Sequence, residues 1–507
     1  MTTIQTRLVK LNQRDNVAVA PSDISSGTTL VPENLTAVDE IPSGHKIATS
    51  FIKKDQPIIK YSQIIGFASS DISAGSHVHT HNVYVQEFKR EYAISEDLKQ
   101  DSQIPQKDFA TFDGIIRRDG RVATRNYIGV LTTVNCSATV AKYIAEQFRQ
   151  IPDEYPNVDG VVALTHAYGC GMNAKGQGLE LLQKTIAGYA IHPNFAGVLI
   201  VGLGCETNQI DYLLEATNLS LSATVRALTI QESGGTAATI RAGKSQILEM
   251  MEIANDVTRI PVPASKLILG LECGGSDAYS GISANPALGK ASDLLILNGG
   301  SSILGETPEI YGAEHLLTRR AVDENVAQKL LKFVHWWEDY TSRNGGEMNN
   351  NPSPGNKEGG LTTIYEKSLG AVAKGGTSNL VDVVDYAEQI TKSGFNFMNT
   401  PGYDPVSVTG MVAGGANVVC FTTGRGSVFG CKPTPSLKLA TNTKMYESMK
   451  EDMDINLGTV LDGESIEDAG ERLFRLILAT ASGKPTKSEE LGFGDEEFTP
   501  WQLGAVM

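Results

Sequence analysis

The sequence is poor in cysteine and in basic side chains, and it lacks long apolar runs. Six cysteines in 507 residues are too few for a disulfide scaffold. Lys and Arg number 43 against 58 Asp and Glu, so the basic face that nucleic acids require is not expected. Apolar runs such as residues 195–203 are too short to cross a membrane, and MTTIQTRLVKLNQRD has no signal-peptide core. We therefore expect a cytoplasmic protein without nucleic-acid or membrane partners.

Glycine, by contrast, is abundant. The 51 glycines fall largely in polar stretches between apolar runs, where tight turns and close backbone approach to a ligand need them. The hydrophobic content of 41% and the charged content of 20% are those of a globular protein. A chain of this length predicts two to four domains.

The organisation of the chain changes near residue 112. Residues 1–90 contain short β-branched stretches between turns and predict a small β-rich domain. Residues 91–112 are polar and aperiodic, as in a linker. Apolar runs then alternate with amphipathic stretches, which predicts a large two-part α/β region divided into residues 113–260 and 261–507.

Three predictions for the second part are specific. Residues 320–343 have the spacing of a long amphipathic helix, and DLLILNGGSSIL at residues 293–304 predicts a strand followed by a loop. Residues 344–360, NGGEMNNNPSPGNKEGG, have the composition of a long unstructured loop, which is either disordered or functional.

Cysteines follow several of the predicted strands. Cys136, Cys170, Cys205 and Cys273 each stand near the end of an apolar run, where a glycine-rich or polar turn begins. Ligands bind at the carboxyl edge of open α/β sheets. Thiolates bind iron or zinc, so a metal or an iron–sulfur cluster is chemically reasonable, although no CxxC spacing supports a closed zinc site. Each cysteine by itself is more often a small buried hydrophobe.

Histidines gather in GSHVHTHN. His77, His79 and His81 alternate, so a strand would place them on one face at roughly 6–7 Å spacing. Neutral imidazoles suit iron, zinc or manganese, which favours a metal site over an exposed strand end. His45 and Lys46 follow a glycine and could supply a further ligand or an acid/base pair.

Three cations lie in polar or glycine-rich turns, where a guanidinium or ammonium group can hold a carboxylate. They are Arg125 in ATRN, Lys357 in PGNK and Arg425 in TGRG. Any one of them alone is more often an ordinary surface charge, but the glycines beside Arg425 favour a function. A nicotinamide enzyme is only a minor alternative, because the turn after VGLG lacks the third glycine of the dinucleotide motif.

Several long motifs together resemble the altronate/galactarate dehydratase family over essentially the whole chain. GHKIA and the stretch from PIIKYSQIIGFA to HVHTHN resemble its SAF-type N-terminal domain. The larger part is similar through THAYGCG, VGLGCE, LECGGSDAYSGISANPALG, NPSPGNKEGG, FTTGRG and MDINLGT. The resemblance implies a fold peculiar to the family and a metal-assisted loss of water that yields a 2-keto-3-deoxy sugar acid.

The resemblance also implies roles for residues. By motif it points to Cys136, His166, Cys170, Cys205, Cys273, Asp277, Asn356, Lys357 and Arg425. Together with the residue patterns above, we expect catalytic roles for His45, Lys46, His166 and Lys357, substrate binding by Arg125, Asp277, Asn356 and Arg425, and metal binding by His77, His79, Cys136, Cys170, Cys205 and Cys273. Fe(II) is the expected ion, with another divalent metal or an Fe–S cluster as alternatives.

The expected substrate is a six-carbon sugar acid. HVHTHN resembles altronate dehydratases, whereas YPNVDGVV, RAVDENVAQKLL and MDINLGT resemble the galactarate branch, which we slightly favour. We also expect a homo-oligomer, a dimer. Alternative functions are a sulfolactate-type sulfo-lyase, whose SAF-type module and large subunit are separate chains, and a non-catalytic sugar-acid-binding regulator.

Overall fold

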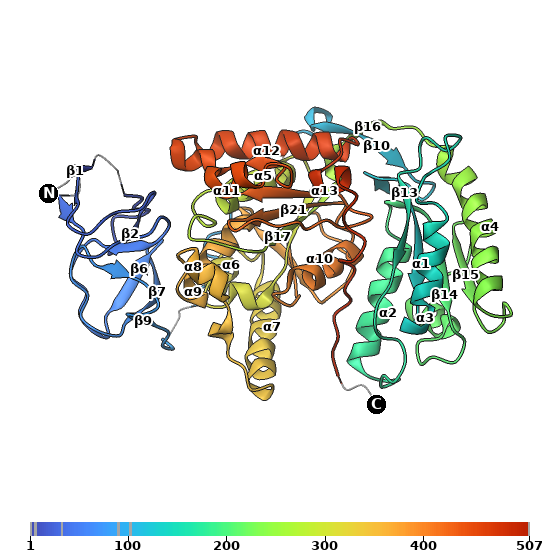
Figure 1. Ribbon diagram of the computed structural model, residues 1–507, viewed down its shortest axis with the longest axis horizontal. Coiled ribbons are helices and arrows are strands. Elements are labelled where there is room, and N and C mark those ends of the chain that lie inside the picture. The colour runs from blue at the N-terminus through green and yellow to red at the C-terminus, as the bar shows by residue number, and fades with distance from the viewer. Residues whose placement is uncertain (1–2, 5–7, 32–33, 89–91, 101–103, 505–507) are drawn as a thin grey trace.

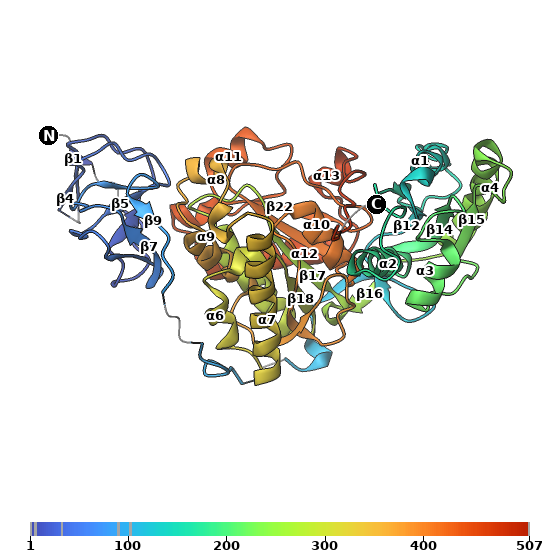
Figure 2. The ribbon, with the colours of Figure 1, turned by 90° about the horizontal axis from the view of Figure 1, so that it is seen from below.

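Three parts of the molecule follow one another along its long axis. The computed structural model describes residues 3–4, 8–31, 34–88, 92–100 and 104–504, so residues 91 and 101–103 of the predicted linker lie outside the description. A β-rich N-terminal domain and a small α/β domain, here called the second domain, lie on opposite sides of a larger C-terminal α/β domain (Figures 1 and 2). The predicted fold class, a β-rich domain followed by an α/β region, is confirmed.

The N-terminal domain consists of three small sheets of three strands each. Its strands are short because turns interrupt the apolar stretches every few residues, and Ile47 and Val78 are fully buried between the sheets. The strands are β1 (Thr3–Ile4), β2 (Val17–Val19), β3 (Thr29–Leu30), β4 (Leu35–Thr36), β5 (Lys46–Ala48), β6 (Pro57–Lys60), β7 (Gln63–Ala68), β8 (His77–Val78) and β9 (Val83–Tyr84).

An antiparallel pair of strands carries the chain into and out of the second domain. The short 3-10 helix η1 (Gln106–Asp108) precedes β10 (Thr111–Ile116), which pairs with β11 (Val122–Ala123) and β16 (Ile260–Pro263). The pairing of Thr111 with Pro263 and of Gly114 with Ile260 ties the start of the second domain to its end.

The second domain is a four-stranded parallel sheet in the order β13-β12-β14-β15. The apolar runs predicted as strands form its centre, since β12 and most of β14 are buried on both faces by helices. Its elements are β12 (Tyr127–Thr132), η2 (Asn135–Ser137), α1 (Ala138–Glu146), β13 (Gly160–Leu164), α2 (Gln177–Ala190), β14 (Phe195–Gly202), α3 (Ile210–Thr217), β15 (Val225–Thr229) and α4 (Thr236–Asn255).

The C-terminal domain is built on a seven-stranded parallel sheet in the order β19-β20-β18-β17-β21-β22-β23. Its strands are β17 (Ile268–Cys273), β18 (Ser301–Leu304), β19 (Leu380–Val384), β20 (Gly394–Met398), β21 (Val418–Thr423), β22 (Ser436–Ala440) and β23 (Ile455–Asn456). The chain extends the sheet to one side of β17 through β18 and then to the other side from β21, so the strand order reverses beside β17.

Helices cover both faces of this sheet. They are α5 (Ala284–Leu297), α6 (Glu314–Thr318), α7 (Glu324–Arg343), α8 (Pro354–Glu358), α9 (Ile364–Ala371), α10 (Asp404–Ala413), α11 (Thr443–Ser448), α12 (Ile466–Ala481) and α13 (Lys487–Glu490). The predicted amphipathic helix in residues 320–343 is confirmed by α7. The reading of DLLILNGGSSIL as one strand and loop was wrong in its first half, because residues 293–297 end α5 and only 301–304 form a strand. Short 3-10 helices η3 (Ala264–Lys266), η4 (Thr307–Ile310), η5 (Met348–Asn350), η6 (Val372–Gly375) and η7 (Gly458–Asp462) complete the domain.

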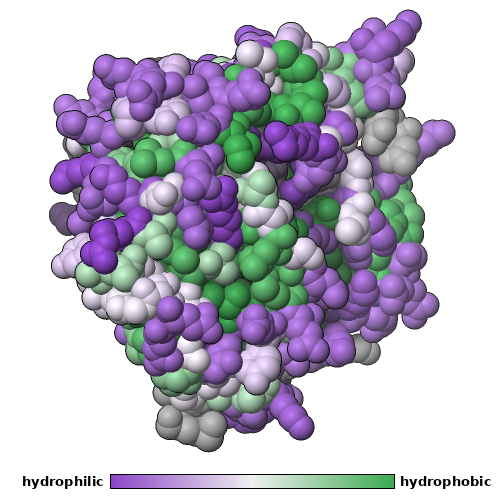
Figure 3. Space-filling view, turned by 90° about the vertical axis from the view of Figure 1, so that its right-hand side faces the viewer, coloured by the Kyte–Doolittle hydropathy of each residue, from purple (hydrophilic) through white to green (hydrophobic). Residues whose placement is uncertain are grey.

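The surface is mixed in polarity. At the end of the molecule formed by the second domain, apolar patches lie among polar side chains (Figure 3). Exposed apolar side chains of this domain include Tyr143, Tyr212 and Leu221. Among the helices that the structure describes, none has both the length and the apolar character needed to cross a bilayer.

Candidate active site

The N-terminal domain contacts the C-terminal domain beside the carboxyl edge of the seven-stranded sheet. The contact centres on α8, which forms because Pro354 starts the helix and Ser353 caps it in a box with Asn356. Residues 344–360 are therefore a partly helical segment, containing η5 and α8, although their composition suggested an unstructured loop. Across the contact, the Ser43 hydroxyl lies 2.8 Å from that of Tyr279, and Thr363 donates to the Ile65 carbonyl oxygen.

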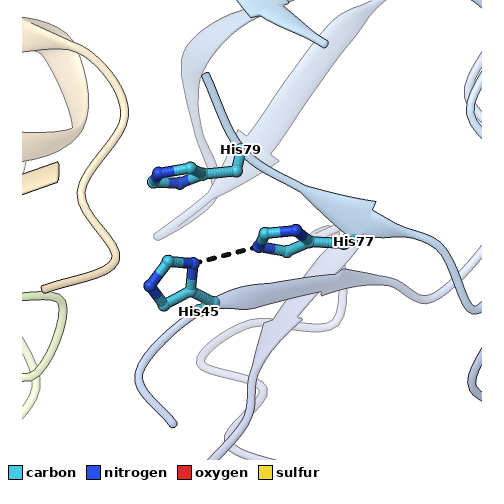
Figure 4. Close-up of side chains that lie close together, drawn as sticks. All are labelled: His45, His77 and His79. Atoms are coloured by element: carbon cyan, nitrogen blue, oxygen red, sulfur yellow. Dashed lines mark hydrogen bonds between the residues drawn. The ribbon is translucent and has the colours of Figure 1, made fainter. Parts of the chain in front are cut away.

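Three histidines of the N-terminal domain converge at this contact. One ring nitrogen from each of His45, His77 and His79 lies within 4.8 Å of the others. Figure 4 shows the three rings side by side, with His45 Nδ1 and His77 Nε2 hydrogen bonded at 3.0 Å. β8 ends at Val78, so a turn rather than strand alternation brings in His79, and His81 is exposed. His45 joins because β5 pairs with β8.

The environment of the trio favours neutral imidazoles. Burial, followed by the charge of a protonated His45, lowers the pKa of His77 to about 4, and burial lowers the pKa of His79 to about 3. His45 Nε2 donates to the Glu358 carbonyl oxygen at 3.1 Å, which leaves Nδ1 as the electron-pair donor. His79 Nδ1 is buried and has no hydrogen-bond partner. Neutral nitrogen donors that face one another fit a divalent ion such as Fe(II).

Lys46 does not face the histidines. Its Nζ donates to the Gly360 carbonyl oxygen at 2.6 Å and to Glu366 at 2.8 Å, and Lys60 donates to the other oxygen of Glu366 at 2.9 Å. All three side chains are buried. Burial lowers the pKa of Lys46 to about 8, against the raising effect of Glu366. For Glu366, burial is outweighed by the two ammonium groups, which hold its pKa well below the usual range.

This buried triad locks the two domains together. Lys46 and Lys60 come from the N-terminal domain, and Glu366 comes from α9 of the C-terminal domain. A buried charge that loses its partner is strongly destabilising, so the triad favours the one docked arrangement in which all its charges are paired. The contacts of Lys46 therefore describe a residue that positions the two domains, whereas the sequence led us to expect an acid/base role.

Asp277 and Asn356 connect loops of the C-terminal domain through hydrogen bonds. Asp277 is buried and accepts hydrogen bonds from Ser280, Thr441 and Asn442. Burial raises its pKa, and these hydrogen bonds oppose the rise. Asn356 donates to the Ser276 carbonyl oxygen at 2.8 Å. Both side chains are hydrogen bonded to other protein groups, and their expected role in substrate binding stays a prediction.

The solvent-facing cations near the trio are Lys357 and Arg425. Lys357 is partly exposed on α8, one residue from the carbonyl group that His45 contacts. Arg425 follows β21 and is exposed, with its guanidinium 3.4 Å from the Glu358 carboxylate. These groups can reach a bound anion without breaking a buried pair.

Two predicted site residues lie elsewhere. Arg125 is buried between the two α/β domains, where it binds Glu489 at 2.6 and 2.8 Å and the Thr480 carbonyl oxygen at 2.8 Å. His166 is buried in the second domain, where Nε2 donates to the Thr132 carbonyl oxygen at 2.9 Å. Burial lowers the pKa of His166 to about 4. The structure gives both residues partners within the protein and does not bring them to the histidine trio.

The four predicted cysteine ligands separate into two places. Cys136, Cys170 and Cys205 are exposed at the carboxyl edge of the four-stranded sheet, whereas Cys273 is buried at the end of β17. The Cys273 thiol contacts Lys374 Nζ at 2.8 Å and the carboxylates of Glu306 and Glu309. The four cysteines therefore do not form a single set of metal ligands.

Sequence reasoning missed the acidic and basic groups around Cys273 and also missed Glu366. Lys374 pairs with Glu306 at 2.9 Å, and Lys367 pairs with Glu309 at 2.6 Å, all buried. Glu306 has a positive φ of 64°, a rare conformation that is permitted here by its buried contacts. In the sequence these residues look like ordinary helix and turn charges, and only the run TTIYEKSLGAVAKGG, with charges inside a small apolar helix, hinted at burial.

Family models match the chain in three successive stretches. Residues 6–86 match the altronate/galactarate dehydratase SAF domain. Residues 114–255 match the D-galactarate dehydratase/altronate hydrolase second domain, and residues 264–506 match the D-galactarate/altronate dehydratase C-terminal model.

Whole-length relatives agree with these matches. The chain is 38% identical to galactarate dehydratase (L-threo-forming) of Escherichia coli over 506 residues, covering 96% of this chain and 95% of that one. It is 35% identical to altronate dehydratase of Bacillus subtilis over 488 residues, covering 96% and 97% of the two chains. The altronate dehydratase of Escherichia coli is also 35% identical, with 96% and 97% coverage.

Proposed function

The chain belongs to the altronate/galactarate dehydratase family, and from this we propose that it removes water from galactarate or altronate with the help of a metal ion. Sugar-acid dehydration by a hydro-lyase is the activity of relatives that cover nearly the whole chain, so it applies to the chain as a unit. The predicted family is thereby confirmed.

The histidine trio is the observation that supports the metal. His45, His77 and His79 would hold the ion, and His45 already has the backbone partner that orients a metal-bound imidazole. Three protein ligands leave room for substrate, as in catalytic rather than structural sites. When bound, Fe(II) would supply a Lewis acid that stabilises negative charge on the substrate's carboxylate and hydroxyl oxygens.

The other groups of the site would position the substrate and move protons. Arg425 would hold a carboxylate, because an exposed guanidinium can bind both of its oxygens. Lys357 would transfer a proton, since its amine is partly exposed beside the trio. The substrate loses the proton on C2 and the hydroxyl group on C3, which leaves as water, and the resulting enol becomes the 2-keto-3-deoxy acid.

An anaerobic assay tests this proposal. The purified chain, loaded with Fe(II), is offered galactarate, altronate and sulfolactate, and the 2-keto product and released sulfite are both measured. We expect a 2-keto-3-deoxy acid from galactarate or altronate, lost on chelation and restored by Fe(II). Absence of product from both sugar acids with and without iron would contradict the proposal, and sulfite from sulfolactate alone would replace it by sulfo-lyase activity.

A further inference from the structure

Three carboxylates meet where neighbouring strands of the seven-stranded sheet end. Glu272 is next to the last residue of β17, Glu306 follows β18, and Asp404 begins α10 in the connection after β20. β20, β18 and β17 are adjacent and parallel, so these residues stand at the same edge of the sheet. One carboxylate oxygen from each lies within 4.8 Å of the other two. The strand order reverses beside β17, which is where open α/β sheets bind ligands.

Several oxygens of this group are buried without a partner. Glu272 is fully buried, and Glu306 is 1% exposed. Among the described residues, none donates a hydrogen bond to either oxygen of Glu272 or to Oε1 of Glu306. A buried carboxylate without a partner is costly. A proton shared by Glu272 and Glu306 would satisfy one oxygen of each but would leave the other oxygen of Glu272 open. A partner that can contact several oxygens at once is therefore favoured.

An adjacent group at the same edge already has its partners. Cys273, Glu306 and Glu309 also place ligand atoms within 4.8 Å of one another. Lys374 Nζ donates to the Cys273 sulfur at 2.8 Å and to Glu306 Oε2 at 2.9 Å. Lys367 Nζ donates to Glu309 Oε1 at 2.6 Å. Lys374 thus binds Oε2 of Glu306, whereas Oε1 remains without a partner among the residues described.

The charges around these carboxylates do not balance. The interacting groups are two ammonium groups and four carboxylates, from Lys367, Lys374, Glu272, Glu306, Glu309 and Asp404. When all are ionised, two negative charges are in excess. Burial, followed by the charges of Glu306 and Glu309, raises the pKa of Asp404 to about 7. One divalent cation would balance the two excess charges.

Two backbone features let these carboxylates approach one another. A Cβ atom on Gly274 would overlap Asp404 Oδ2, so glycine is needed there for the Asp404 side chain to lie beside the end of β17. Glu306 has a φ of 64°, a conformation that non-glycine residues keep mainly at functional sites. Asp404 is only partly buried, which leaves an ion a path from solvent. The backbone thus favours this gathering of carboxylates.

We propose that Glu272, Glu306 and Asp404 bind one divalent cation that prefers oxygen ligands, namely Mg²⁺, Mn²⁺ or Ca²⁺. Such ions lie about 2.0–2.6 Å from each oxygen, so two ligands on opposite sides of one ion are about 4–5 Å apart. The oxygens of the three carboxylates, within 4.8 Å of one another, fit this range. The bound ion ties together the segments that follow β17, β18 and β20, and so stabilises the C-terminal domain.

This cation site does not rest on the proposed dehydration. Its three ligands belong to the C-terminal domain, whereas the histidine trio belongs to the N-terminal domain. The ligand chemistry differs as well, because carboxylates suit Mg²⁺, Mn²⁺ and Ca²⁺, whereas neutral imidazoles suit Fe(II). The ion of one site can therefore be lost while the other is kept.

Metal analysis of the full-length His77→Ala variant tests the proposal, because this variant lacks one ligand of the histidine trio. The protein is stripped with a chelator, desalted and offered Mg²⁺, Mn²⁺ or Ca²⁺ separately, and the bound metal is counted by mass spectrometry. We expect about one ion per chain with at least one of the three cations. Free ion at about 100 times its Kd should raise the Tm by about 5 °C. Adding Glu272→Gln or Asp404→Asn should lower the bound metal at least about tenfold.

Cys273→Ala is the matched control, because it removes a neighbouring candidate ligand and leaves all three carboxylates in place. It should retain the ion, and circular dichroism should show that each variant is folded. The proposal is overturned if none of the three cations binds stoichiometrically, or if Cys273→Ala loses as much metal as Glu272→Gln. Full retention of metal in both Glu272→Gln and Asp404→Asn would also overturn it. Because His77→Ala should lose dehydration but keep this ion, failure of one proposal is distinguishable from failure of the other.

Discussion

The carboxyl edges of the two parallel sheets differ in what covers them. The edge of the four-stranded sheet is exposed, and three cysteines project from it as free thiols. The edge of the seven-stranded sheet is covered, so that Cys273 is buried among Glu306, Glu309 and Lys374. Two parallel sheets thus present exposed thiols in one domain and paired, buried charges in the other. Whether other parts of the chain bury the carboxyl edge, rather than the position of a residue in the sheet, determines whether a side chain at a strand end is open to solvent.

The largest expected effect is on kcat/KM, and it concerns the histidine trio at the domain contact beside the seven-stranded sheet. His77→Ala removes one of three converging ligands, so we expect the kcat/KM of the iron-loaded enzyme to fall about 10³-fold, equivalent to about 4 kcal/mol. His81→Ala is the matched control, because His81 lies outside the trio and is exposed, and its kcat/KM should change less than about 3-fold. Equal losses in the two variants would mean that the trio is not the metal site.

The second effect tests whether the buried ion pairs of Lys46 and Lys60 with Glu366 hold the N-terminal domain on the C-terminal domain. Glu366→Gln leaves Lys46 and Lys60 buried without their carboxylate, so the free energy of unfolding should fall by about 3–5 kcal/mol in urea. Glu496→Gln removes a partner of Lys142 in an exposed pair and should cost less than about 1 kcal/mol. A cost for Glu366→Gln as small as that of the control would contradict the role of the triad.

The third effect separates a structural arginine from a binding arginine. Arg125→Ala leaves Glu489 without its buried partner, so urea unfolding should show a stability loss of about 3 kcal/mol with little change in KM. Arg425→Ala should instead leave stability unchanged and raise the KM for the sugar acid about tenfold. The reverse pattern would return Arg125 to the substrate site predicted from the sequence.

The effect that is smallest per pH unit concerns the opposite edges of the sheets, which His192 joins through a hydrogen bond from Nε2 to the Ala416 carbonyl oxygen. Burial lowers the pKa of His192 to about 4 from 6.5, and the hydrogen bond opposes the shift. Between these values the unfolded chain binds more protons, so this contribution is complete above about pH 6.5. It is lost as pH falls toward 4, by up to about 1.4 kcal/mol per pH unit.

The measurement is a series of urea unfolding curves across this pH range. His192→Gln cannot titrate, so its stability should depend less steeply on pH than that of the wild type. Identical slopes in the two proteins would show that His192 does not contribute to acid destabilisation.

Local pattern was sufficient for most of the strands and helices. The runs that became β12, β13 and β14 are apolar and bounded by turns, and α7 has a clear helical period, so neighbouring residues carried the signal. It failed at residues 293–297, because the end of α5 is apolar on several sides and has no distinct face. A buried helix and a buried strand cannot be distinguished by period alone.

The candidate site was predictable in part only, because its partners are far apart in the chain. The alternation of His77 and His79 drew attention to the segment in which the histidines converge, but β8 is too short for alternation to set their geometry. Nothing in the local sequence indicates that Arg125 pairs with Glu489 or that Lys46 pairs with Glu366. Buried pairs of this kind satisfy charges across domains, and they become visible only when the fold is known.

The triad of Lys46, Lys60 and Glu366 also sets an order of events during synthesis. Glu366 lies 320 residues after Lys46. At about 5–20 residues per second, the ribosome makes that stretch in roughly 15–60 s. Through this interval the N-terminal domain has emerged with its lysines hydrated and its histidine face uncovered. The nascent chain therefore carries an open histidine face before the domain that covers it has been made.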